Sequence, residues 1–325
     1  MRRPLSLPRV ASLWRLVENP RPRGLVIVPV LSWRTLREVR RDRVFGMAAE
    51  AAFWALLSLP PLALALLGLV GYVGELFGPD AVTQVRTSIL GSVGQVLTPA
   101  AMRGVVRPLV NHLLSPGRGD LVSLSFLIAL WSGSAAMSRY LATITVAYDM
   151  ERLRSIWRRR LLAFVLNLGG IVLGVVLLLL LVVGPDLVAE SIAGSSVARA
   201  SAVAQAVYWP VVMLLAVCGL ATLYHIGVPV RTPWRRDLPG AVLAMALWAA
   251  GSFTLRFYLT SGLREAAYGP LAAPIAALLF LYVAALAVLV GAELNSEIDA
   301  LWPVESTSEG RERARESTGA VTTSQ

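Results

Sequence analysis

Long runs of apolar residues alternate with short polar segments along most of this chain. The clearest run is 271–292, which carries no charge and is apolar on every side. A helix needs about 20 such residues to cross a hydrocarbon core of roughly 30 Å. The run ends abruptly in Gly291-Ala292-Glu293-Leu294-Asn295-Ser296-Glu297. Because a helix of this kind is unstable in water, the pattern predicts an all-α integral membrane protein.

The same hydropathy criterion predicts a bundle of six membrane-spanning helices. Their expected ranges are 46–77, 121–146, 161–183, 207–227, 240–260 and 271–292. The first range is too long for one straight crossing at about 1.5 Å per residue. Pro60 and Pro61 lie in its middle. Two prolines remove two backbone donors and clash with the preceding turn, so we expect a kink or a break there.

Two connecting segments carry apolar residues at helical spacing. The longer is 78–120, for which we expect two short amphipathic helices. Segment 184–205 shows the same pattern between the third and fourth spans. Both segments fall on the side of the membrane opposite the termini, so short extracytoplasmic helices are predicted.

The two ends of the chain are polar, and the membrane domain between them covers 29–302. We expect 1–28, rich in Arg and Pro, to be a flexible tail, and 303–325, charged and rich in Ser and Thr, to be disordered. Residues 29–43 alternate apolar and Arg positions around Trp33. This predicts a basic amphipathic helix lying against anionic lipid headgroups, with a solvated arm as the alternative.

The charge balance reflects membrane topology. Only 15% of the residues are charged, the net charge is +10, and all thirty basic residues are Arg. Of these, 22 fall in the two tails and the loops on their side, against 6 in the opposite loops. The positive-inside rule therefore predicts that both termini are cytoplasmic. No nucleic-acid partner is expected. The sequence does not decide whether the chain forms a homo-oligomer.

Small residues recur on some spans. Gly170 and Gly174 on the third span have the spacing that permits close helix packing. This spacing more often serves fold assembly than function.

Five polar residues lie near the cytoplasmic ends of the predicted spans, where a central charge costs about 2.5–3.5 kcal/mol. They are Glu50, Arg139, His225, Glu293 and Asn295. Arg139 lies at a depth at which it can pair with Glu50 or Glu293. The functional interpretation is a polar vestibule open to the cytoplasm, holding a substrate or a proton. The alternative is that these groups snorkel to the headgroups or clamp helices.

Motifs of known enzymes do not occur in the sequence. The two histidines, His112 and His225, have no metal-ligand spacing with another His, Cys or carboxylate. A Walker A motif requires Lys, and the chain has none. The single Cys218 excludes an internal disulfide. We therefore expect no catalytic residues, metal or cofactor, and no nuclease activity.

Three segments together carry a family resemblance. They are Met47-Ala48-Ala49-Glu50-Ala51-Ala52-Phe53-Trp54-Ala55-Leu56-Leu57-Ser58-Leu59-Pro60-Pro61, then Ala147-Tyr148-Asp149-Met150-Glu151 with Trp157-Arg158-Arg159-Arg160-Leu161, and Tyr268-Gly269 with Gly291-Ala292-Glu293-Leu294-Asn295-Ser296-Glu297. Over about 30–302 the chain resembles the YihY/BrkB family of bacterial inner-membrane proteins, once labelled ribonuclease BN-like. It departs from the family pattern at Glu50, Thr145, Pro270 and Pro274.

The resemblance implies six transmembrane helices and a plasma-membrane location, but no settled activity. The family is described as related to transport or to the cell envelope. We expect a transporter or a protein that handles lipids or other amphiphiles. The alternative is an envelope scaffold or assembly factor, in which neutralising Glu50, Arg139 and Glu293 would reduce stability only.

Overall fold

The computed structural model describes residues 27–77, 87, 119–193, 197–260 and 272–322. Most of these residues are helical, and no strand occurs among them. The helices are α2 (Ile27–Arg41), α3 (Val44–Phe77), α7 (Gly119–Ala147), α8 (Ile156–Ala193), α9 (Val197–Gly227), α10 (Leu238–Thr260), α12 (Ala272–Leu301) and α13 (Glu305–Thr322), with short 3-10 turns η3 (Glu151–Leu153) and η4 (Trp234–Asp237). The all-α prediction is thus confirmed for this part of the chain.

Five helices in the described part are long and apolar enough to cross a membrane. They contain the segments Val44–Leu62, Ile156–Leu177, Val207–Gly227, Trp234–Phe257 and Pro274–Leu301. These segments correspond to the predicted first, third, fourth, fifth and sixth spans. The predicted second span, 121–146, forms the 29-residue helix α7 but is not one of the five.

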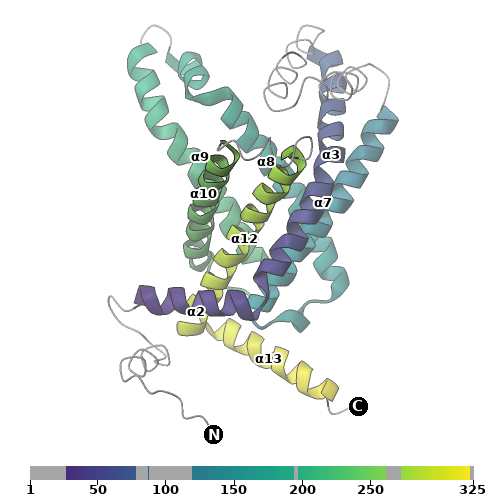
Figure 1. Cartoon of the computed structure of the whole chain (residues 1–325), viewed down its shortest axis with the longest axis vertical. Coiled ribbons are helices and arrows are strands. Elements are labelled where there is room, and N and C mark those ends of the chain that lie inside the picture. The colour runs from purple at the N-terminus through teal and green to yellow at the C-terminus, as the bar shows by residue number, and fades with distance from the viewer. Residues whose placement is uncertain (1–26, 78–86, 88–118, 194–196, 261–271, 323–325) are drawn as a thin grey trace.

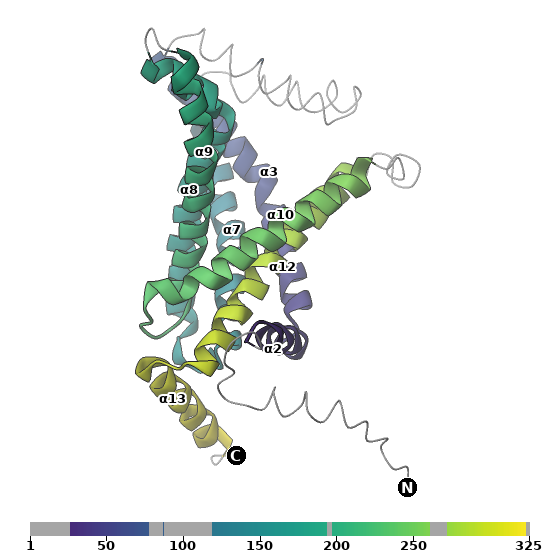
Figure 2. The same cartoon turned by 90° about the vertical axis from the view of Figure 1, so that its left-hand side faces the viewer.

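The six long helices form a ring in which each helix contacts two neighbours. Consecutive helices form the hairpins α3–α7, α8–α9 and α10–α12, while α7 contacts α8 and α12 contacts α3. Contacts between α9 and α10 close the ring. Figure 2 shows α10 and α12 running diagonally to α8 and α9, so these two hairpins diverge away from the end that carries α13.

Helix α2 lies crosswise at one end of the bundle and contacts α12 and α3 (Figure 1). It buries Val30, Thr35 and Val39, whereas Trp33 and Leu36 are exposed. The predicted helix at 29–43 is therefore confirmed with slightly different ends. Its contact with lipid headgroups remains a prediction.

The prolines of α3 do not interrupt the helix. Residues 44–77 form one continuous helix that contains Pro60 and Pro61, so of the predicted kink or break the break does not occur, while the kink stays a prediction. The hydroxyl of Ser58 donates to the Ala55 carbonyl at 2.7 Å, one turn before the prolines. Prolines are tolerated in membrane helices where neighbouring helices pack against them, and α3 packs on α7.

Two further predictions about polar segments were wrong. The described parts of 184–205 continue α8 and α9 and do not form separate short helices. Segment 199–206 is rich in Ala, which favours helix extension.

The C-terminal tail, expected to be disordered, forms α13 from Glu305 to Thr322. It buries Thr307, Gly310 and Ala314 on one face, and this packing stabilises a helix whose composition alone would not. The predictions for 1–26 and for the two short helices within 78–120 concern residues that the structure does not describe, apart from residues 87, 119 and 120.

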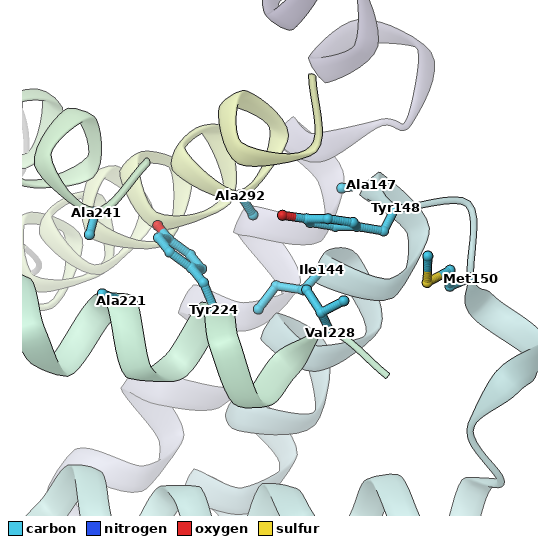
Figure 3. Close-up of a cluster of buried hydrophobic side chains, with 9 residues drawn as sticks. All are labelled: Ile144, Ala147, Tyr148, Met150, Ala221, Tyr224, Val228, Ala241 and Ala292. Carbon is cyan, nitrogen blue, oxygen red and sulfur yellow. The ribbon is translucent and has the colours of Figure 1, made fainter. Parts of the chain in front are cut away.

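A buried apolar cluster joins the ends of α7, α9, α10 and α12 (Figure 3). Within it the hydroxyl of Tyr224 donates to the Val288 carbonyl of α12 at 2.6 Å. At the α10–α12 crossing, a Cβ on Gly240 would overlap the Gly291 carbonyl oxygen. Only glycine permits this approach. By contrast, a Cβ on Gly174 would meet nothing within 4 Å, so the predicted close packing there was wrong.

Candidate functional site

The first candidate pair, Glu50 and Arg139, forms an ion pair between α3 and α7. Arg139 Nη2 lies 2.8 Å from Glu50 Oε1, which confirms one of the two pairings expected from depth. At the same interface between α3 and α7, Thr143 Oγ1 lies 3.2 Å from the Met47 sulfur. The Glu50 and Arg139 side chains are 43% and 45% exposed, so the pair lies at the outer surface of the bundle.

His225, near the end of α9, faces an acid that the sequence analysis did not select. Its Nδ1 lies 3.3 Å from Oδ2 of Asp237, whose side chain is 1% exposed. Asp237 ends η4, immediately before α10. In the sequence it follows Arg235 and Arg236 and therefore looks like part of a solvated loop. An acid directly before an apolar helical run is a helix-start signal that could have identified it.

Asn295 links the end of α12 to the start of α10. Its Oδ1 accepts a hydrogen bond from the Gly240 backbone N–H at 2.7 Å, and its Nδ2 donates to the Asp237 carbonyl at 3.1 Å. The first backbone N–H groups of a helix have no partner within that helix. Asn295 satisfies one of them from a different helix, which makes it a structural clamp at this crossing.

Glu293 is two residues away but lies in different surroundings. Its side chain is 1% exposed, and Oε1 has no hydrogen-bond partner among the described residues. Four carboxylates interact with it electrostatically, those of Asp42, Glu38, Glu297 and Asp149.

Asp42 lies outside the spans, in the turn between α2 and α3. Burial, followed by the neighbouring Glu38 carboxylate, raises the pKa of Asp42 to about 6. Its neighbour Arg43 has a backbone φ of 56°, in the left-handed region that favours glycine. The connection that sets α2 crosswise is therefore strained.

A further acid, Asp299, binds the C-terminal helix to the bundle and was also missed. It is 3% exposed, and its carboxylate lies 3.3 Å from Arg236 Nη1 and 3.1 Å from Arg311 Nη2. The hydroxyl of Thr307 donates to the same carboxylate at 3.1 Å. The arginines had been interpreted only as topological signals. Because Asp299 is 63 residues from Arg236 and 12 residues from Arg311, no local sequence pattern indicates these ion pairs.

Arg154 closes the end of α9. Its guanidinium donates to the carbonyls of Ile226, Gly227 and Val228 at 3.2–3.3 Å. These are terminal carbonyls without helical partners, and a cation complements the negative end of the helix. Burial lowers the pKa of Arg154 from its usual value.

The five predicted residues therefore do not form one site. His225 and Asn295 share the neighbourhood of Asp237, Glu50 pairs with Arg139 on the outer face of α3 and α7, and Glu293 is buried separately. Among the described residues no group of three or more His, Cys, Asp and Glu side chains has a geometry that could hold a metal ion.

Comparison with known proteins identifies the family. The family model described as Virulence factor BrkB matches residues 35–316, which is most of the chain. The chain belongs to the BrkB family. It is also 29% identical over 252 residues to a protein of Bacillus subtilis (strain 168) named "Putative ribonuclease-like protein YfkH", covering 77% of this chain and 88% of that protein. No solved structure matches the chain. Family membership and the five apolar helices together indicate a multi-pass membrane protein.

Proposed function

We propose that this BrkB-family protein transports an amphiphilic solute across the plasma membrane and has no nuclease or other enzymatic activity. In this proposal it crosses the membrane six times, with α7 as the additional span and both termini in the cytoplasm. Helix α7 has 29 residues and packs between α3 and α8, like the five apolar helices around it. Helices α2 and α13 lie at one end of the bundle, which also carries the Arg-rich loops (Figure 1).

The buried carboxyl group of Glu293 is the observation that carries the transport proposal. An ionisable side chain within a span is costly and is by default a functional candidate, because apolar residues would fill the same space at lower cost. Glu293 Oε1 has no hydrogen-bond partner among the described residues, in contrast to the side chain of Asn295, which links α12 to α10. We infer that Glu293 binds the proton or cation that drives transport.

The divergence of the helix hairpins supports an amphiphilic solute. Helices α9 and α10 present large apolar side chains at their surfaces, including Trp209, Leu214, Phe253 and Phe257. The two hairpins that carry them lean apart toward the end distant from α13 (Figure 2). Such an arrangement suits a solute with an apolar portion that enters from the bilayer.

A scaffold is the second candidate, and specific contacts favour it. Asn295 holds α10 to α12, and Asp299 holds α13 to the bundle. In a scaffold the polar residues would serve only such contacts, and replacing Glu293 by an uncharged residue would change stability alone.

Flux measurements in vesicles separate the two candidates. The full chain is reconstituted with phosphatidylglycerol that carries a fluorescent headgroup, and dithionite then quenches the label in the outer leaflet, with and without a pH gradient. We expect the wild type to raise the quenched fraction above that of protein-free vesicles in a gradient-dependent manner. Glu293→Gln should abolish the gradient dependence, and the exposed-site variant Glu312→Gln should retain it. If wild-type vesicles behave as protein-free vesicles under every gradient, transport of this amphiphile class is rejected.

A further inference from the structure

The outer seam of α3 and α7 carries a strip of polar and aromatic side chains. On α3, residues 50, 53, 54 and 57 follow the spacing of one helix face, and on α7 residues 139, 131 and 127 do the same. The rings of Trp54 and Trp131 meet edge to face across the seam at 5.9 Å, and Phe53 meets Trp54 in the same way. The Glu50–Arg139 ion pair lies at the α2 end of this strip.

The strip lies on the outer surface of the bundle, which faces lipid in a membrane protein. Phe53 and Trp131 are each 55% exposed, and Leu57 and Leu127 are also exposed. An ion pair beside such side chains borders hydrocarbon, where unsatisfied polar groups are costly. The guanidinium of Arg139 has five N–H donors, and the contact with Glu50 leaves donors for a second anion.

The depth of the pair suits a lipid headgroup. Glu50 is six residues from Val44, which corresponds to about 9 Å along α3 from the crosswise helix α2. The headgroup layer is roughly 5–8 Å thick on each side of the hydrocarbon core. The pair therefore lies just below this layer, within the reach of a long side chain or of a headgroup drawn slightly inward.

We propose that this strip is a binding site for a phospholipid with a primary ammonium headgroup. The phosphate accepts hydrogen bonds from Arg139, the ammonium donates to the Glu50 carboxylate, and the acyl chains lie along Phe53, Leu57 and Trp131. A headgroup that contains both charges complements both members of the pair, whereas a purely anionic headgroup is repelled by Glu50. The proposal concerns binding at equilibrium and does not depend on transport.

Native mass spectrometry of the full chain in mild detergent tests the site. Equal amounts of phosphatidylethanolamine, phosphatidylglycerol and phosphatidylcholine with the same acyl chains are added, and the bound lipids are counted. The wild type should prefer phosphatidylethanolamine. Arg139→Gln should weaken its binding about tenfold, as expected for loss of one charge-assisted hydrogen bond, and Glu50→Gln should remove the preference over phosphatidylglycerol. The control is Arg313→Gln, which breaks the Arg313–Glu309 ion pair of the same 2.8 Å length on α13.

The variant Arg139→Lys tests the lipid site even if Arg139→Gln does not fold. It retains a cation for Glu50 but lacks the planar set of donors that binds phosphate. We expect a normal thermal midpoint with severalfold weaker phosphatidylethanolamine binding. Wild-type lipid binding in Arg139→Lys would overturn the proposal. So would a wild-type dimer that dissociates in Arg139→Gln with its bound lipids unchanged, because the strip would then be an interface between two copies of the chain.

Discussion

Replacing Asp299 by Asn should release α13 from the bundle. The carboxylate is 3% exposed and contacts Arg236, Arg311 and Thr307. Breaking a fully buried ion pair costs about 3–5 kcal/mol, and an exposed pair contributes about 0–1 kcal/mol. Here the Arg236 and Arg311 side chains are 35% and 16% exposed. They also donate to the carbonyls of Trp302 and Tyr148, which remain after the substitution. We therefore expect an intermediate loss of about 2–3 kcal/mol.

Hydrogen exchange of α13 is the appropriate assay, because the lost contacts connect this helix to the bundle. A loss of about 2–3 kcal/mol raises the population of the open state roughly 30- to 150-fold, and amide exchange between Thr307 and Ala314 should accelerate by that factor. The control is Glu309→Gln, which breaks an exposed pair on the same helix and should change exchange only about twofold. If Asp299→Asn changes the exchange of α13 no more than this control, the ion pairs do not hold the helix and our reasoning is wrong.

Three further predictions concern stability, measured as thermal unfolding midpoints in detergent. Gly240→Ala should cost more than about 3 kcal/mol because its Cβ would overlap the α12 backbone, whereas Gly174→Ala, with open space around it, should be neutral or stabilising; equal effects would contradict this packing. Arg43→Gly should stabilise by about 1 kcal/mol by removing left-handed strain, and a lower midpoint would refute the strain. Asp42 has a folded-state pKa of about 6, above its ordinary value, so its carboxyl contributes stability at low pH that is lost as pH rises through 6. Asp42→Asn should therefore raise the midpoint at pH 8 but not at pH 4, and a difference independent of pH would contradict the shift.

Local sequence patterns determined the long apolar helices, the helix α2 and one of the contacts between helices. The hydropathy of a segment indicates whether it is stable in water or in hydrocarbon. The five apolar helices and the amphipathic helix α2 could therefore be predicted without any tertiary information. The Glu50–Arg139 pair was also predictable, because the positions of both residues follow from counting along two antiparallel helices. Family membership was identifiable from three short segments taken together.

Tertiary structure decided how polar residues and glycines are used. Asp237 and Asp299 resemble ordinary loop acids, and only contacts with residues distant in sequence place them inside the protein. Helix α13 has too little apolar surface to be predicted, yet it is stabilised by packing against the bundle. Gly170 and Gly174 have the favourable spacing, but the close approach occurs at Gly240 and Gly291. Spacing states which residues share a helix face, whereas the folded bundle decides which neighbour that face meets.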